Sequence, residues 1–105
     1  MNNANLSETK VSIKVAFDVM GTLIGPHQDN VLQLYRSLEA IGCVMIVWSA
    51  YDIEKIRELI APLGITPHYI FKKVSPEVYP DICVDDSEDF VMSCRERGIK
   101  PILVK

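Results

Sequence analysis

The sequence predicts one α/β domain with a parallel sheet of about five strands and helices on both faces. Short apolar runs alternate with segments whose apolar residues recur at helical spacing, which is typical of strands and helices that alternate along a chain. Four of the apolar runs are followed closely by polar or charged residues, as at the ligand-binding edge of such a sheet. The 105 residues suffice for a single modest core, and we expect the domain to span residues 11–105.

Composition and charge argue against several classes of protein. Hydrophobic residues make up 49% of the chain, which argues against disorder, and the net charge of −3 gives no support for a nucleic-acid-binding face. We expect residues 1–10 to be a disordered tail, and they lack the apolar core of a signal peptide. No apolar run reaches the roughly 20 residues that a membrane span needs. The three cysteines have no metal-ligand spacing and are expected to be reduced thiols of a cytoplasmic protein.

The predicted elements follow from these patterns in order along the chain. The strands, recognised as short apolar runs, are expected over residues 11–19, 43–48, 68–71, 82–84 and 101–104. The helices, recognised by their spacing, are expected over residues 30–41, 53–63 and 88–97, with Asp29 or Asn30, Asp52 and Ser87 as N-caps. Only nine residues, 72–80, join the third strand to the fourth, fewer than the dozen or so that a parallel crossover usually needs. We therefore expect either a crossover without a full helix or a shorter strand.

Polar side chains stand at the ends of four predicted strands. They are Asp18 after the first, Ser49 after the second, Lys73 or Lys72 after the third, and Asp85-Asp86 after the fourth. Each alone has an ordinary structural explanation as a cap or a solvated charge. Because the carboxyl ends of parallel strands meet at one edge of the sheet, we expect these side chains to lie close together.

Such a cluster would suit a phosphoryl group. Three neighbouring carboxylates raise one another's pKa values, and a hard cation such as Mg²⁺ relieves their repulsion. A hydroxyl and a lysine would then bind phosphoryl oxygens while an aspartate attacks phosphorus.

In these residues the sequence resembles the haloacid dehalogenase superfamily, most of whose members are phosphatases. Residues 18–23, Asp-Val-Met-Gly-Thr-Leu, are similar to its first motif, Asp-x-Asp-Gly-Thr-Leu. Residues 47–49 are similar to the second, an apolar strand ending in Ser or Thr, and residues 73–79 to the third, often Lys-Pro-x-Pro-x-x-Tyr. Residues 84–87 are similar to the acidic fourth motif. The resemblance covers residues 11–104 and implies a three-layer, Rossmann-like fold.

The resemblance also implies an activity. Asp18 would be the nucleophile of a Mg²⁺-dependent phosphohydrolase or phosphotransferase and would become an aspartyl-phosphate. Ser49 and Lys73 would act with it and, together with Gly21, bind the phosphoryl group. The implied Mg²⁺ ligands are Asp18, the main-chain carbonyl of Met20, and one or both of Asp85 and Asp86.

Two features differ from most phosphatases of this superfamily. Met20 stands where they carry an acid/base aspartate, and Met cannot move a proton. Only 26 residues separate Thr22 from Ser49, so we expect no cap domain there, nor between Ser49 and Lys73. An open site would admit a phosphate borne by a macromolecule, unless a neighbouring subunit of a homo-oligomer covers it.

Two other functions are compatible with parts of the pattern. The first is a binding or assembly module that keeps the fold but lacks turnover, which Met20 favours. The second is a phospho-acceptor receiver domain, whose paired acids follow its first strand and whose acceptor follows its third. Here the acidic pair follows the fourth strand, which argues against a receiver.

Overall fold

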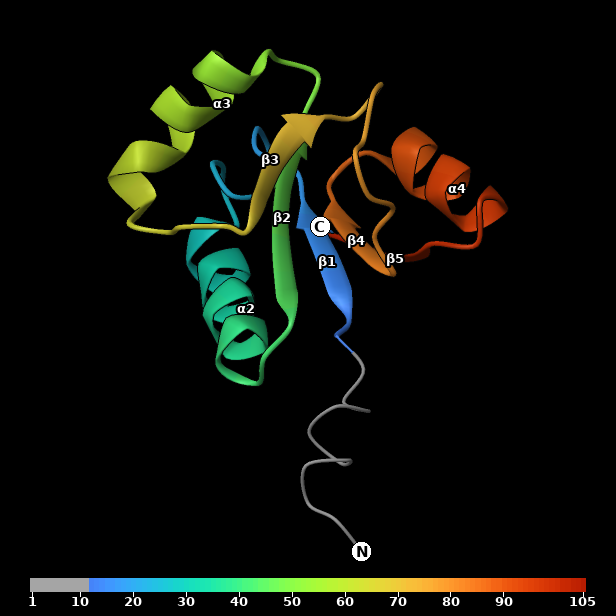
Figure 1. Cartoon of the computed structure of the whole chain (residues 1–105), viewed down its shortest axis with the longest axis horizontal. Helices are drawn as coiled ribbons and strands as arrows, with labels where there is room; N and C mark the ends of the chain where they lie inside the picture. The colour runs from blue at the N-terminus through green and yellow to red at the C-terminus, as the bar shows by residue number, and fades with distance from the viewer. Residues whose placement is uncertain (1–11) are drawn as a thin grey trace, which may run out of the picture.

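The protein is described by a computed structural model that covers residues 12–105. Five parallel strands form one sheet in the order β3-β2-β1-β4-β5 (Figure 1). The strands are β1 (Lys14–Phe17), β2 (Val44–Ser49), β3 (Tyr69–Lys72), β4 (Ile82–Asp85) and β5 (Lys100–Leu103). The helices are α2 (Gln28–Ala40), α3 (Ile53–Ile60) and α4 (Glu88–Glu96), and a 3₁₀ turn, Ala61–Leu63, follows α3. The predicted α/β fold with a five-stranded parallel sheet is confirmed.

The sheet lies between two layers, which gives the three-layer arrangement that the sequence predicts. Helices α2 and α3 pack on one face, where Phe17 and Tyr35 belong to the larger apolar core. Helix α4 packs on the other face, where Trp48 and Cys94 belong to a second core. The central strand β1 is buried on both faces, which explains why it is an unbroken apolar run after Lys14 rather than an alternating one.

Several element boundaries differ from those expected. Strand β1 ends at Phe17, so Asp18 lies just past it, while β4 extends to include Asp85. The proposed start of the first strand at Val11, and the expected disordered tail over residues 1–10, lie outside the described residues. Asp18 therefore lies just beyond the end of β1, whereas Asp85 is the last residue of β4.

The predicted cap of the first helix is wrong, whereas the other two caps are confirmed. Neither Asp29 nor Asn30 caps α2, because the chain turns directly into the helix after Pro26: the amide of Gln28 donates to the carbonyl of Gly25, and the amide of Val31 to that of His27. The other caps are shown by two hydrogen bonds, from the amide of Lys55 to Asp52 (2.9 Å) and from that of Phe90 to Ser87 (3.2 Å).

The connection from β3 to β4, residues 73–81, contains no helix. The distances explain why so few residues suffice. The segment passes β2 and β1 to reach β4, three strand spacings or roughly 14 Å away, and it also returns along the sheet by the length of a four-residue strand, roughly 13 Å. Nine extended residues can span about 30 Å. Val78 of this segment packs against the core that contains Trp48 and Phe71, so the segment covers part of the sheet face that a helix would otherwise cover.

The cysteines are buried and form no disulfide, as the sequence predicts. Burial, with a smaller contribution from the neighbouring Cys94 thiol, raises the pKa of Cys83, so this thiol stays protonated. Among residues 12–105, none of the helices has the length and apolar character needed to cross a membrane.

Candidate functional site

The polar residues that end the strands meet where β1 and β4 lie side by side. From β1 the chain continues toward β2, whereas from β4 it continues toward β5, so the order of the strands reverses between these two neighbours. Ligands of open parallel sheets bind beyond the carboxyl ends of the strands at such a reversal. The amide of Asp18 donates to the carbonyl of Val84 over 3.0 Å, which fixes the position of Asp18 beside the end of β4.

Lys73 joins the two strand ends. Its Nζ lies 2.9 Å from Oδ1 of Asp18 and 2.7 Å from Oδ2 of Asp85. The side chains are 16%, 10% and 0% exposed, respectively, so these ion pairs are largely shielded from water. The amide of Lys73 donates to the carbonyl of Ser49 (2.9 Å), which anchors this loop at the end of β2.

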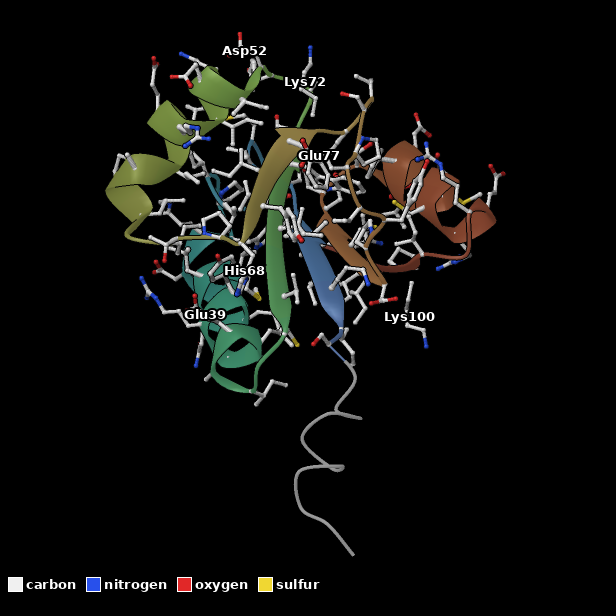
Figure 2. All side chains as sticks on the ribbon, in the orientation of Figure 1. Glu39, Asp52, His68, Lys72, Glu77 and Lys100 are labelled. Carbon is white, nitrogen blue, oxygen red and sulfur yellow. The ribbon has the colours of Figure 1, made fainter. Side chains whose placement is uncertain are left out.

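The structure distinguishes between the two lysines that the sequence leaves open. Lys72 is the last residue of β3 and pairs in register with Ser49. Its side chain points away from the body of the molecule (Figure 2). Lys73, one residue later, is the lysine that reaches the carboxylates.

Asp85 is held by groups on both sides. Its Oδ2 accepts from Lys73, and its Oδ1 accepts from the amide of Ser87 (2.9 Å). Ser87 is also the N-cap of α4, so the turn that begins the helix fixes the orientation of the carboxylate.

The loop after β1 contacts the second acid of the pair. The Thr22 hydroxyl lies 3.4 Å from Oδ2 of Asp18 and 3.2 Å from Oδ1 of Asp86. It carries one hydrogen, so it cannot donate fully to both carboxylates. Gly21 has φ of 85°, and a Cβ at this position would overlap the Asp86 carboxylate, so only glycine allows the loop this close.

The pKa values of Asp18 and Lys73 reflect this crowding. Burial raises the pKa of Asp18 to about 6; Lys73 opposes the rise, while Asp85 and Asp86 add to it. Burial by itself would lower the pKa of Lys73, but hydrogen bonds and charge interactions with Asp85 and Asp18 outweigh it and raise that pKa. Near neutral pH the lysine is therefore charged, and Asp18 is mostly ionised.

The cluster has an excess of negative charge. Asp18, Asp85 and Asp86 each offer a carboxylate oxygen, and these oxygens lie within 4.8 Å of one another. When all are ionised, three negative charges face the single positive charge of Lys73, a net charge of −2. Carboxylate oxygens are the ligands that Mg²⁺ and other hard cations prefer.

Three other residues named from the sequence have different surroundings. Ser49 is buried at the end of β2, and its Oγ accepts from the amide of Tyr51 (3.4 Å). Met20 has a side chain that is 45% exposed. The amide of Gly21 already donates to the carbonyl of Ile24 (2.6 Å) and is not free to bind a phosphate, so Gly21 contributes here by its lack of a side chain.

The sequence argument assigned no role to Thr22 or Phe90. Thr22 lies inside the first motif, so its position next to Asp18 was a signal that could have been used. Phe90 lies in the first turn of α4, and its ring centroid is 4.1 Å from Nζ of Lys73. No local pattern connects Phe90 to a lysine in another loop, because the contact exists only once the chain has folded.

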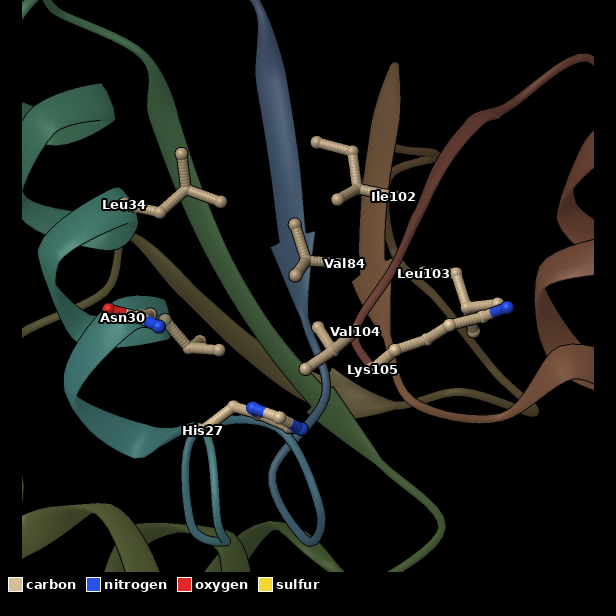
Figure 3. Close-up of a pocket in the computed structure, with 9 residues that line it drawn as sticks. His27, Asn30, Leu34, Val84, Ile102, Leu103, Val104 and Lys105 are labelled. Carbon is tan, nitrogen blue, oxygen red and sulfur yellow. The ribbon is translucent and has the colours of Figure 1, made fainter.

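A separate pocket of about 230 Å³ lies between α2 and the end of β5 (Figure 3). It is lined by His27, Asn30, Val31, Leu34, Val84, Ile102, Leu103, Val104 and Lys105. Successive side chains of a strand point to opposite faces, so Val84 and Asp85 face different sides of the sheet. The pocket is therefore on the α2 side and does not contain the carboxylate cluster.

Comparison with known proteins adds no assignment. The sequence matches no protein-family model, and no curated protein shows significant similarity to it. The chemistry of the site must therefore be argued from its own residues.

Proposed function

We propose that this protein is a Mg²⁺-dependent phosphohydrolase or phosphotransferase of the haloacid dehalogenase type that acts through an aspartyl-phosphate on Asp18. The observation that carries the proposal is the ammonium group of Lys73 between Asp18 and Asp85, beside Asp86. A nucleophilic carboxylate, a fixed cation and two further acids at a strand-order reversal are the parts that phosphoryl transfer needs. The four sequence motifs that resemble this superfamily support the same reaction.

The donor set fits Mg²⁺. The cluster has oxygen ligands only, and the net charge of −2 that its three carboxylates carry together with Lys73 balances a divalent cation. The ligands that we propose are Asp18, Asp86, the main-chain carbonyl of Met20, and Asp85 either directly or through water, since Asp85 already accepts two hydrogen bonds. When bound, Mg²⁺ would offset the charge of the carboxylates and of the phosphoryl oxygens.

The residues of the chain would divide the remaining work. Asp18 attacks phosphorus through a carboxylate oxygen, and the bond from phosphorus to the leaving oxygen breaks. Lys73, charged and held by Asp85, keeps the Asp18 carboxylate in place and donates to a phosphoryl oxygen. The Ser49 hydroxyl, at the end of the neighbouring strand, donates to another.

Met20 limits both steps of this reaction. Its side chain can neither protonate a leaving oxygen nor activate the water that hydrolyses the aspartyl-phosphate. We therefore expect weak turnover of ordinary alkyl phosphates and an aspartyl-phosphate that persists. Met20 also supports a second function, a binding or assembly module that holds a metal and a phosphoryl group without turnover.

The connections beside the site are short. Residues 18–27 join β1 to α2, and residues 73–81 join β3 to β4. We therefore propose that the phosphoryl group is borne by a macromolecule, or that a second subunit of a homo-oligomer covers the edge.

Hydrolysis of acetyl phosphate tests the proposed reaction, because its leaving group needs no general acid. We expect Mg²⁺-dependent release of phosphate by the wild-type protein and none by Asp18→Asn, with acid-stable trapping of phosphate on the wild-type chain. Asp52→Asn is a matched control, because Asp52 is an exposed aspartate that caps α3 after β2 and does not belong to the carboxylate cluster. A wild-type protein that binds Mg²⁺ but is inert would favour the binding module.

A further inference from the structure

Each of three site residues is followed, one or two residues later in the sequence, by an exposed apolar side chain. Met20 follows Asp18 and is 45% exposed, Tyr51 follows Ser49 and is 44% exposed, and Val74 follows Lys73 and is 80% exposed. The loops that carry them follow β1, β2 and β3, which are neighbours in the sheet. The three residues therefore lie at the same edge of the sheet as the site, and we call them the apolar rim (Met20, Tyr51 and Val74).

The opposite side of this edge has a different character. The loop after β4 and the first turn of α4 carry Asp86, Glu88 and Asp89, and all three are exposed. The β4 side of this edge is thus acidic, whereas the loops after β1, β2 and β3 each present one exposed apolar side chain among polar neighbours. The acids have a role near a cation, and exposed apolar side chains beside a polar site gain free energy when a ligand covers them.

Building on the proposed function, we propose that the site takes phosphate monoesters of phenols and that the apolar rim binds the aromatic ring. Met20 and Tyr51 supply the two side chains suited to this contact, because thioethers and aromatic rings both pack favourably against an aromatic ring. Met20 thus has a specificity-determining role in place of an acid/base role.

The chemistry of the leaving group points to the same class of substrate. A phenol ionises near pH 10, so its oxygen leaves as phenolate much more readily than an aliphatic alcohol leaves as alkoxide. In the first step the carboxylate of Asp18 forms a bond to phosphorus, and the phosphorus–phenol oxygen bond breaks with its electron pair on that oxygen. The phenolate then takes a proton from water. In the second step water adds to phosphorus, Asp18 leaves as carboxylate, and phosphate and a proton are released.

A binding experiment tests the rim without requiring turnover. Benzylphosphonate and ethylphosphonate both carry a carbon in place of the bridging oxygen and cannot be hydrolysed there. With Mg²⁺ present, calorimetry should show that the wild-type protein binds benzylphosphonate about tenfold more tightly than ethylphosphonate, a tenfold ratio of the two dissociation constants. This ratio should fall toward one in Met20→Ala and in Tyr51→Ala. Met92→Ala is the matched control, since Met92 is 57% exposed on α4, away from the rim, and its ratio should equal the wild-type ratio.

Turnover separates failure of the rim from failure of the proposed function. The protein should hydrolyse phosphotyrosine at least tenfold faster than phosphoserine, and the ratio of kcat/KM for phosphotyrosine to that for acetyl phosphate should fall in Tyr51→Ala. A higher kcat/KM for a phosphotyrosyl peptide than for free phosphotyrosine would indicate that the aryl phosphate is borne by a protein. Hydrolysis of acetyl phosphate with equal binding of the two phosphonates would overturn the aryl proposal alone. No binding of either phosphonate with Mg²⁺ bound would overturn both proposals.

Discussion

The ammonium group of Lys73 lies over the ring of Phe90, 4.1 Å from its centroid. The same ring packs edge-to-face against Trp48, with 5.5 Å between the ring centroids. The second core of the sheet is thereby linked to the lysine that bridges Asp18 and Asp85. Phe90 thus has two contacts with distinct consequences: it packs against Trp48 in the core, and its ring attracts the ammonium group of Lys73.

Replacing Phe90 with leucine should remove the cation–π contact with Lys73 while keeping an apolar side chain against Trp48. We expect the coupling between the two positions to be about 1 kcal/mol, the usual size of a partly buried cation–π contact. A double-mutant cycle of Phe90→Leu with Lys73→Met, followed by urea denaturation, measures this coupling. Phe90→Tyr keeps the ring and should retain the coupling. Additive effects of Phe90→Leu and Lys73→Met would show that the cation–π contact contributes nothing.

The stability of the metal-free protein should depend on pH through Asp18. Its pKa is about 6 in the folded protein and 3.8 in the unfolded chain, so between these values the folded state binds the proton more tightly. The free energy of unfolding should therefore fall as pH rises from about 4 to about 6, and above that range the Asp18 contribution should not change further. The shift of about two pKa units corresponds to roughly 3 kcal/mol.

Urea unfolding in EDTA at several pH values measures this slope. Asp18→Asn removes the titrating group and should flatten the curve over the same pH range. Asp89→Asn, an exposed acid on α4, should leave the slope unchanged. A wild-type protein whose stability rises between pH 4 and 6 would contradict the unfavourable burial of the Asp18 carboxylate.

Mg²⁺ should stabilise the fold by binding the folded state and not the unfolded one. A concentration one hundred times the dissociation constant gives about 2.7 kcal/mol, enough to raise the melting temperature by several degrees. Thermal melts with and without millimolar Mg²⁺ measure the shift. Replacing Asp85 and Asp86 together with alanine should abolish it, whereas Asp52→Ala should not. Melting of the wild-type protein that is indifferent to Mg²⁺ would remove the case for a metal centre.

The sequence predicted the fold better than it predicted the contacts of the site. The apolar run of β1 and the caps Asp52 and Ser87 are local features, so their physical causes are visible in neighbouring residues. The convergence of Asp18 and Asp85 was predictable because parallel strands share one edge. The pairing of Lys73 with Phe90 was not, because it depends on how a loop and a helix pack on the same face of the sheet.

Met20→Asp tests whether the missing proton donor limits the reaction. An aspartate at this position would protonate the leaving oxygen of an alkyl phosphate and then activate the water that hydrolyses the aspartyl-phosphate. General acid–base catalysis of this kind is worth roughly 10²- to 10⁴-fold where the proton transfer limits the rate. We therefore expect a gain of that order on an alkyl phosphate, a smaller gain on an aryl phosphate, and a shorter lifetime of the trapped phospho-protein.

Steady-state rates on one alkyl and one aryl phosphate, for wild type, Met20→Asp and Met20→Asn, measure the effect. Asparagine matches aspartate in size but cannot serve as an acid or base, so a gain in both variants would reflect the loss of Met20 rather than proton transfer. Met20 is exposed, so the new carboxylate meets water rather than the core, and we expect Met20→Asp to leave folding unchanged. If wild type already hydrolyses the alkyl ester well and Met20→Asp adds nothing, another group supplies the proton.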